Sequence, residues 1–311
     1  MDRRALLWSI IYAALLLLCF SKLALVTISL LMIPVVLMFV KLDTGKFVVA
    51  YGLTLIAVYA VLALFGAGML GSIAVIYSLF FLAPSVAMGS LYKKKAPAKT
   101  VLTGGTVAFL AQILLFLLLL TLLGVRVTDE MREFVRGSLE TTLPAEWRQA
   151  LPEDLIAQTV EMVVQLLPVY LIGISLYFTV VTHWLSRKLL IRSGEQVPAL
   201  KPAKDWMLPK SFVWIYLVAL VLSFMFTKPD GSLMYMIQLN VLPLVSLAFI
   251  VQAVGFCFFA ASVKGWSKKT PVIVTIVCVF LMLVIPGAYR LFTLLGLFDV
   301  VFPIRNRLKN S

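Results

Sequence analysis

Residues 242–263 read LPLVSLAFIVQAVGFCFFAASV, a stretch without a single charged side chain. A run of this length can cross the hydrocarbon core of a bilayer as one helix. Lipid offers the backbone no hydrogen-bond partner, so membrane-spanning segments are helices or closed barrels, and barrel strands read as short alternating runs. Because this stretch is continuous and long, it predicts a transmembrane helix.

The rest of the chain repeats this pattern. Of its 311 residues, 62% are hydrophobic and 13% are charged, which is more apolar surface than a soluble domain of this size can bury. We therefore expect an all-α polytopic transmembrane bundle of about 8–10 spans. The candidate spans are about 5–21, 23–40, 47–65, 70–91, 101–124, 162–185, 211–227, 242–263 and 271–289.

The first two candidate spans are separated only by Ser21 and Lys22. They form either a tight hairpin or one helix broken at mid-depth, and their combined length favours the hairpin, since it is roughly twice what one crossing needs. The start, Met1 to Arg4 and then an apolar run, resembles a signal peptide, but no small-x-small cleavage site follows. We expect a retained first helix.

The basic residues indicate the orientation. With the N-terminus in the cytoplasm, 17 of the 27 Lys and Arg fall in inside segments and six fall in outside segments before the tail. This bias fits the positive-inside rule and predicts a multi-pass protein of a bacterial cell membrane. It also explains the net charge of +13 through topology and anionic lipid, so we expect the bilayer as partner and no nucleic acid.

The basic tail conflicts with a count of nine spans, which would leave it outside. It holds the last four basic residues, Arg290, Arg305, Arg307 and Lys309. Residues 291–303 could re-enter or cross at a thin place, one span could be false, or the tail could be outside. We favour an even number of crossings with the tail inside.

Two polar segments interrupt the spans. Residues 125–161 hold eight of the 14 acidic residues and carry apolar positions at helical spacing, so we expect an extracytoplasmic excursion of two amphipathic helices broken near Pro144 and Pro152. It is either a connector or a lid over an outward-facing cavity. Residues 186–210 form a basic cytoplasmic loop with three prolines, and Trp206 fits an interfacial anchor.

Signatures of catalysis are absent from the sequence. The single histidine, His183, cannot build a multi-histidine metal site, and the chain contains neither a phosphate-binding GxxxxGK[ST] loop nor a GxSxG elbow. We expect no enzyme activity, cofactor or metal. Any transport would need an ion gradient or a separate ATPase module.

Polar side chains at membrane depth are costly unless they are paired or line a cavity. They therefore define a candidate solute pocket, in which amides and a phenol meet an outer carboxylate. The alternative, which we weigh more heavily, is that amides and hydroxyls hold helices together. The candidates are Gln112, Glu161, Gln165, Tyr170, Asn240 and Gln252.

The second half of the chain carries a series of landmarks in a fixed order. They are Pro168, Arg187 to Arg192, Trp206 with Pro209, and Leu295-Gly296 with Asp299 and Arg305. In these landmarks the second half resembles the YybS-like family of bacterial membrane proteins, and the first half resembles it only in span pattern. The family has no established function or binding motif, so the resemblance assigns no site residue. The N-terminal half is also similar in style to substrate-binding subunits of energy-coupling-factor vitamin transporters.

Two hypotheses of function follow. The first is a solute-binding transporter component, favoured by polar groups in the spans and by the lack of an internal energy source. The second is a membrane scaffold or regulatory protein in envelope growth or sporulation, acting through its basic inner loops.

Overall fold

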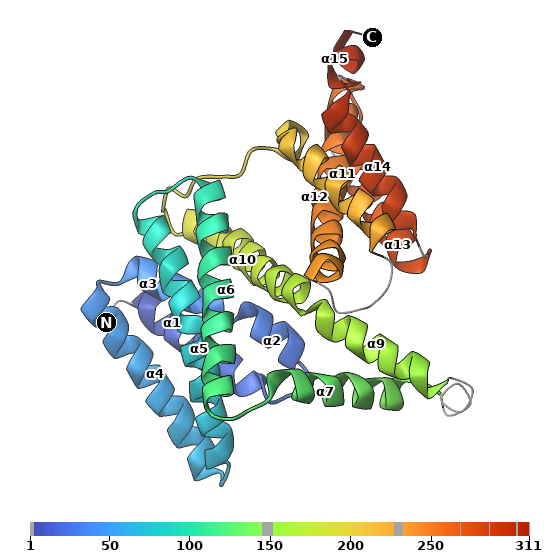
Figure 1. The fold of residues 1–311 in the computed structure, drawn as a ribbon. Coiled ribbons are helices and arrows are strands. Elements are labelled where there is room, and N and C mark those ends of the chain that lie inside the picture. The colour runs from blue at the N-terminus through green and yellow to red at the C-terminus, as the bar shows by residue number, and fades with distance from the viewer. Residues whose placement is uncertain are drawn as a thin grey trace. The chain divides into compact units, whose positions relative to one another are not determined.

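The structure is a computed structural model (Figure 1). Helices are the only regular secondary structure among the residues that it describes. The described residues are 3–144, 152–226, 233–267, 269–285, 287–302 and 304–310. They form two compact units, and each is treated separately below. Unit 1 comprises residues 1–142 and 170–200, and unit 2 comprises residues 143–169 and 201–311.

Unit 1 is built around a buried central helix. Helix α3 has every side chain from Met32 to Phe39 buried, and it packs against α1, α4 and α5. The helices of this unit are α1 (Arg3–Leu18), α2 (Ala24–Leu30), α3 (Met32–Lys41), α4 (Thr44–Leu64), α5 (Gly68–Lys93), α6 (Ala98–Leu122), α7 (Val127–Thr142) and α10 (Leu167–Arg192), of which α10 begins in unit 2.

The first two candidate spans form a hairpin. After α1 the chain turns through residues 19–23, and α2 and α3 then pack back against α1. Helices α2 and α3 are separated only at Leu31 and make one apolar segment, Ala24–Lys41. Of the two arrangements that the sequence left open, the structure therefore has the hairpin.

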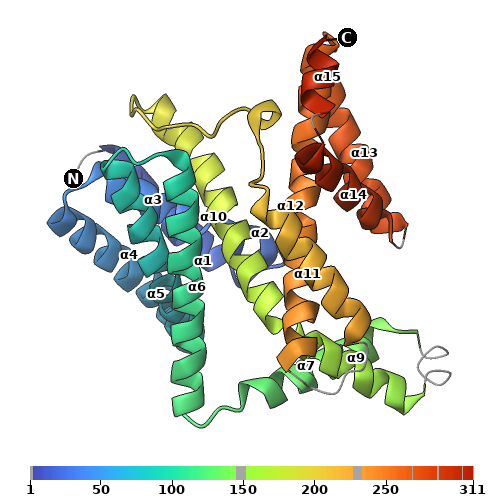
Figure 2. The ribbon, with the colours of Figure 1, turned by 45° about the horizontal axis from the view of Figure 1, so that its top comes forward.

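Unit 2 is organised by one long helix, α12, which contacts every other helix named for this unit. Figure 2 shows α11 lying beside α12. The helices are α9 (Glu153–Gln165), the short 3-10 helix η1 (Ala203–Asp205), α11 (Ser211–Met225), α12 (Leu233–Val263), α13 (Thr270–Val284), α14 (Ala288–Val301) and α15 (Ile304–Asn310).

Helix α14 runs parallel to α12 in close contact. Gly296 lies so near the backbone of Phe249 that a Cβ atom would overlap the Phe249 carbonyl. Three residues further along each helix, Asp299 bonds to Gln252. The guanidinium of Arg305 then lies over the Phe259 ring, 5.0 Å from its centroid. This register fixes the level of each α14 residue along α12.

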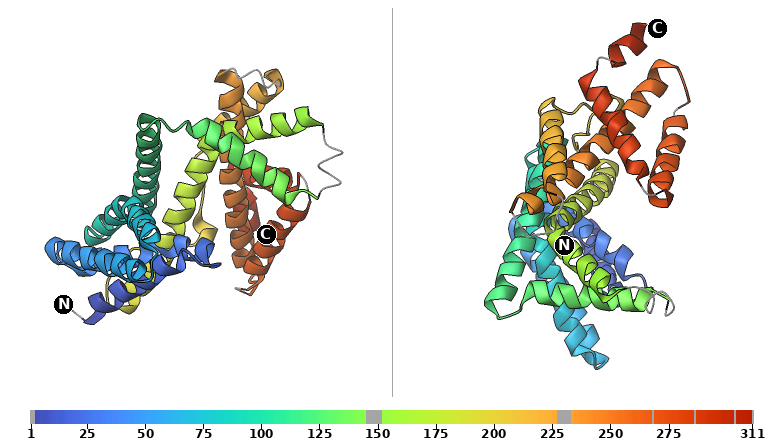
Figure 3. Two further views of the ribbon diagram at one scale, coloured as in Figure 1. Left: turned by 90° about the horizontal axis from the view of Figure 1, so that it is seen from below. Right: turned by 45° about the vertical axis from the view of Figure 1, so that its right-hand side comes forward.

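Helices α13 and α14 form a short hairpin, which the right-hand view of Figure 3 shows below the terminal α15. They have 15 and 14 residues, or about 22 and 21 Å at 1.5 Å per residue, against about 30 Å for a full crossing. Each of the two helices is therefore shorter than a segment that crosses the whole bilayer usually is. The register places Arg290 level with Pro243, which lies ten residues after the first residue of α12, Leu233.

The tail lies on the same side of unit 2 as the basic loop. An Nη1 donor of Arg305 bonds to the carbonyl oxygen of Lys204 at 2.7 Å. Since Lys204 belongs to the segment 186–210, this contact agrees with an even number of crossings. That this side is the cytoplasm, and that the N-terminus shares it, stay predictions from the positive-inside rule.

The predicted all-α polytopic bundle is confirmed. Among the described residues, six helices are long and apolar enough to cross a membrane: Ala24–Lys41, α4, α5, α6, α10 and α12. Three shorter apolar helices, Leu6–Leu18, α11 and α13, correspond to the remaining candidate spans.

Two boundaries differ from expectation. Helix α12 begins at Leu233 rather than near 242, because its polar residues Gln238 and Asn240 continue the helix. Helix α10 begins at Leu167 rather than 162, since Pro168 cannot donate to the preceding turn and α9 ends before it at Gln165. The segment expected to be an amphipathic excursion contains α7 and α9, and both prolines lie outside these helices.

Candidate functional site

Three of the six predicted pocket residues meet in unit 2. The Asn240 amide donates to the carbonyl oxygens of Gln165 at 2.9 Å and Met236 at 2.8 Å, and its oxygen accepts from the backbone N–H of Val169 at 3.3 Å. The Gln165 amide donates to Glu161 at 3.4 Å. The amide of Asn240 thus joins α12 to the junction of α9 and α10, which is the helix-linking role of the alternative reading.

The other three candidates lie elsewhere. Gln112 and Tyr170 belong to unit 1, and Gln252 belongs to a separate network of unit 2. None of the six lines the two cavities described below. Their role in binding a solute stays a prediction from the sequence.

A fully buried carboxylate lies at the loop side of unit 2. Asp299 receives a bidentate pair of hydrogen bonds from Arg305, with Nε to Oδ1 at 2.9 Å and Nη2 to Oδ2 at 2.7 Å. The Gln252 amide donates to the same carboxylate at 2.5 Å and accepts from the backbone N–H of Leu208 at 2.9 Å. Together with the bond from Arg305 to Lys204, this network fastens α12, α14, α15 and the basic loop to one another.

The network gathers landmarks that are far apart in the sequence. The network includes or adjoins four of the residues that carried the family resemblance, and nothing in the sequence indicated that they would meet. They are Trp206, Gly296, Asp299 and Arg305. Asp299 interrupts the apolar run LLGLFDVVF and is followed six residues later by an arginine. A lone acid in such a run could have indicated a buried ion pair.

A cavity of about 590 Å³ lies between α11, α12 and α14. Its volume falls within the range of ligand pockets, roughly 300–1,000 Å³. Five side chains with hydroxyl groups and one arginine line it among apolar residues. The lining residues are Tyr216, Leu220, Ser223, Phe224, Leu242, Pro243, Ser246, Leu247, Ile250, Tyr289, Arg290, Thr293 and Leu294.

The polar groups of this cavity differ in how far they are already engaged. The hydroxyl of Ser223 donates to the Leu220 carbonyl at 2.7 Å, and that of Thr293 donates to the Tyr289 carbonyl at 2.9 Å. Among the described residues, Arg290 contacts its neighbour Tyr289, with a long hydrogen bond of 3.5 Å from Nε to the hydroxyl and with the guanidinium 5.9 Å from the ring centroid. The guanidinium is therefore the strongest donor in the cavity that is still available.

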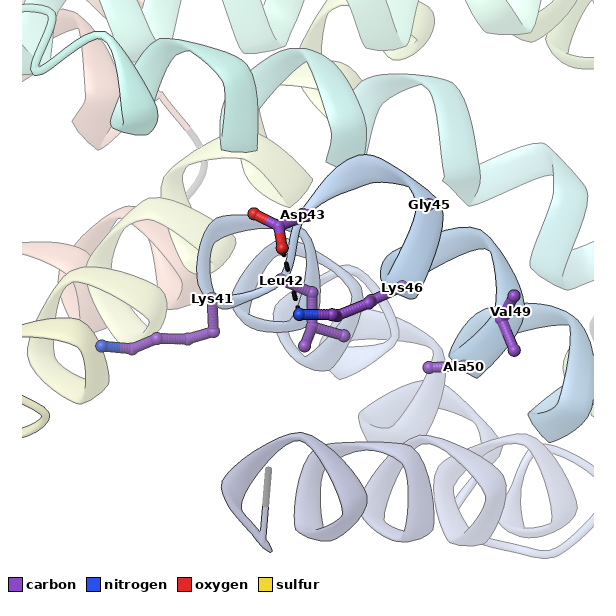
Figure 4. A pocket seen from close by; sticks show the side chains of 7 residues that line it. All are labelled: Lys41, Leu42, Asp43, Gly45, Lys46, Val49 and Ala50. Atoms are coloured by element: carbon purple, nitrogen blue, oxygen red, sulfur yellow. Dashed lines mark ion pairs between the residues drawn. The ribbon is translucent and has the colours of Figure 1, made fainter. Parts of the chain in front are cut away.

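A second hollow of about 590 Å³ lies at the turn between α3 and α4 of unit 1 (Figure 4). Its two cations are already paired. Lys41 bonds to Glu195 at 2.7 Å, and Lys46 lies 3.3 Å from Asp43, as the dashed line in Figure 4 shows. This hollow is a less suitable binding site than the cavity of unit 2, because a ligand would have to displace these carboxylates.

His183 is buried in unit 1. Its Nδ1 lies 2.7 Å from the Tyr92 hydroxyl, and the two rings stack. On the same helix, the hydroxyls of Thr179, Thr182 and Ser186 are buried without a partner among the described residues. Within those residues, no group of three His, Cys, Asp or Glu could hold a metal ion.

Comparisons with known proteins identify the family of this chain. A family model described as "Predicted membrane protein (DUF2232)" matches residues 9–300. The chain belongs to this family. It is 28% identical over 230 residues to "Uncharacterized protein YybS" of Bacillus subtilis (strain 168), covering 72% of this chain and 73% of that protein. The resemblance to YybS-like proteins is thus confirmed, and the family match also covers the first half. No solved structure matches the chain.

Proposed function

We propose that this multi-pass membrane protein of the DUF2232 family is the solute-binding component of a transporter. The observation that carries the proposal is the cavity between α11, α12 and α14, in which hydroxyl groups and Arg290 line a largely apolar hollow. Transporters commonly bind their substrates near the middle of the bilayer, where interrupted helices bring polar groups to that depth. The short lengths of α13 and α14 support a re-entrant hairpin of this kind, and the proposal includes one whose turn lies within the bilayer and brings the cavity to that depth.

The sequence supports a component that borrows its energy. It lacks a nucleotide-binding loop, so active uptake would require a separate ATPase module or an ion gradient. Unit 1, with its six apolar segments α1, α2–α3, α4, α5, α6 and α10, is then the part available for docking such a module. This division of roles is part of the proposal.

The test is ligand-dependent thermal stability of the purified full chain in lipid nanodiscs. We expect a member of a panel of vitamins and metabolites to raise the melting temperature, since a ligand that binds only the folded state stabilises it. Copurification of an ATPase subunit from the native membrane would support the proposal further. No shift across the panel, together with no copurifying ATPase, would contradict it.

A variant that fills the cavity, compared with a matched control outside it, tests whether the ligand binds there. Ser246→Leu adds bulk inside the cavity, whereas Ser262→Leu makes the same change on α12 outside it. We expect the first variant to lose the ligand-dependent shift and the second to keep it, with similar melting temperatures without ligand. If Ser246→Leu does not fold, Ser223→Phe on α11 fills the same cavity. A shift that survives both changes would place the ligand elsewhere.

A scaffold or regulatory role is the second candidate. It is favoured by the way in which Arg305 holds the basic loop against the tail through the Lys204 carbonyl, because this gives the loop a fixed shape. This role predicts that alanine substitutions in Arg187–Lys210 abolish the cellular phenotype, while substitutions at Gln165, Tyr170 and Asn240 have no effect. The transporter proposal predicts instead that cavity variants abolish it.

A further inference from the structure

The proposed re-entrant hairpin would place Arg290 at a depth where an arginine is rare. It is level with Pro243, which lies ten residues, or about 15 Å, along α12 from Leu233. It also precedes Asp299 by nine residues of α14, or about 13 Å. A charged side chain near the middle of a bilayer is costly and marks a functional site unless it is paired.

The part of the chain that the structure describes supplies no charged partner for this arginine. Among the described residues, no carboxylate lies within 4.0 Å of Arg290, whereas the buried Arg305 is paired with Asp299 and Lys41 is paired with Glu195. Its position does not stabilise α14 either. Arg290 stands in the first turn of that helix, where the helix dipole disfavours a cation.

The residues that line the cavity around Arg290 indicate which class of ligand would bind there. The cavity contains no acidic residue, so nothing in it favours a cation. The Arg290 guanidinium and the Tyr216 hydroxyl lie at its wall, and a guanidinium binds carboxylate and phosphate oxygens through parallel hydrogen bonds. The remainder of the wall is largely aliphatic and aromatic, through Leu220, Phe224 and Ile250 among others.

We infer that this cavity binds an amphipathic anion, with its carboxylate or phosphate on Arg290 and its apolar body between α11 and α12. The inference rests on the proposed function and names the substrate class of the same site. Pro243 strengthens the polar character at this level, because a proline inside a helix leaves the carbonyl four residues earlier, that of Leu239, without its helical donor. The anion could be a soluble acid or a lipid head group, and both present the same chemistry.

The experiment uses the full chain in phosphatidylcholine nanodiscs, with octanoate as the soluble probe and octanamide as its neutral counterpart. The lipid probe is a nanodisc in which a fraction of the phosphatidylcholine is replaced by phosphatidylglycerol. Arg290→Gln removes the charge, and Arg192→Gln removes an arginine at the end of α10 in unit 1. Both variants should match the unmodified chain in melting temperature without probe and in elution as a single species.

We expect octanoate to stabilise the unmodified chain and Arg192→Gln saturably, and octanamide to do so much less. Arg290→Gln should weaken octanoate binding at least about tenfold, the low end of what a charge-assisted hydrogen bond contributes. Stabilisation by phosphatidylglycerol alone, lost in Arg290→Gln, would support the inference with a lipid as the anion. Arg290→Lys should restore part of the affinity, because it keeps the charge without the planar fork.

Two results would overturn the inference. One is equal binding of the anions by the unmodified chain and Arg290→Gln, and the other is no binding of either anionic probe. If neutral solutes from the metabolite panel still bind and are blocked by Ser246→Leu, only the anionic class is wrong and the transporter proposal stands. If no solute binds at all, both fail.

Discussion

At the scale of single residues, Asp299 forms a buried ion pair with Arg305 in unit 2. Its side chain is 0% exposed and that of its partner Arg305 is 12% exposed. Removing one member of a buried ion pair leaves the other without compensation, which costs about 3–5 kcal/mol. Asp299 also accepts a hydrogen bond from Gln252, and Arg305 donates one to the Lys204 carbonyl. A substitution in the pair therefore disturbs more than one contact of the network.

We therefore predict that Asp299→Asn lowers the free energy of unfolding by about 3–5 kcal/mol, measured by denaturant titration in mixed micelles. Asp43→Asn is the matched control. Asp43 pairs with Lys46 in an exposed ion pair, and its side chain is 84% exposed, so its loss should change stability by less than about 1 kcal/mol. Equal losses in the two variants would show that the buried pair has no special weight.

The residues of the candidate site were only partly accessible from sequence. Single-residue reasoning found Gln165, Asn240 and Gln252 because amides are conspicuous in apolar runs, and the structure gives each of them hydrogen-bond partners. Arg290 was counted only as part of a basic tail. Its depth depends on the register of α14 against α12, and no feature of a linear sequence reports that register.

At the scale of helices, the packing of α14 on α12 depends on a single glycine. Gly296 lets the two backbones approach so closely that no side chain fits between them. Even one methyl group must push the helices apart or shift the register that positions Arg290 and Asp299. Close helix contact through small residues is a common means of association in membranes.

We predict that Gly296→Ala destabilises the protein and weakens any ligand-dependent thermal shift, because the site is built on the α12–α14 contact. Gly173→Ala on α10 provides the comparison. A Cβ atom there meets nothing within 4 Å, and alanine forms helices better than glycine by up to about 1 kcal/mol, so its stability should stay the same or rise. Thermal melting of the two variants in nanodiscs measures the difference. A Gly296→Ala variant as stable as Gly173→Ala would argue against the close contact.

Most helices could be predicted because bilayer thickness gives long apolar runs a definite meaning. The candidate spans 47–65, 70–91 and 101–124 agree with α4, α5 and α6 to within three residues at each end. The length rule failed for α14. A helix of 14 residues that carries Arg290 and Asp299 does not satisfy a criterion based on apolar runs, and Asp299 is accommodated there by partners on other helices.

At the scale of the whole molecule, the sequence and the structure constrain topology together. The basic loops indicate which side is cytoplasmic, and the contact between Arg305 and Lys204 shows that loop and tail share a side of unit 2. Neither source alone gives both facts. The compact six-segment unit 1 could not be separated from unit 2 by composition, because both units consist mainly of similar apolar segments.

We predict that cysteines placed at Lys204, Lys264 and Arg307 react from the cytoplasmic side in a chain whose three native cysteines are replaced. Lys204→Cys keeps the backbone carbonyl that Arg305 binds, so it should not disturb the network. A membrane-impermeant maleimide, applied to intact cells and to inverted vesicles, distinguishes the two sides. Labelling of Arg307→Cys from the side opposite to Lys264→Cys would require an odd number of crossings between them.

The central claim is that α13 and α14 re-enter the bilayer, since the depth of Arg290 and of the cavity follows from it. Leu283 near the turn is the most direct probe, because its side chain is 81% exposed and does not line the cavity. In the cysteine-replaced chain, Leu283→Cys should resist an impermeant maleimide applied outside intact cells, while Glu130→Cys on α7 should react. If Leu283→Cys reacts as fast as Glu130→Cys, the hairpin reaches the outer surface and the account is wrong.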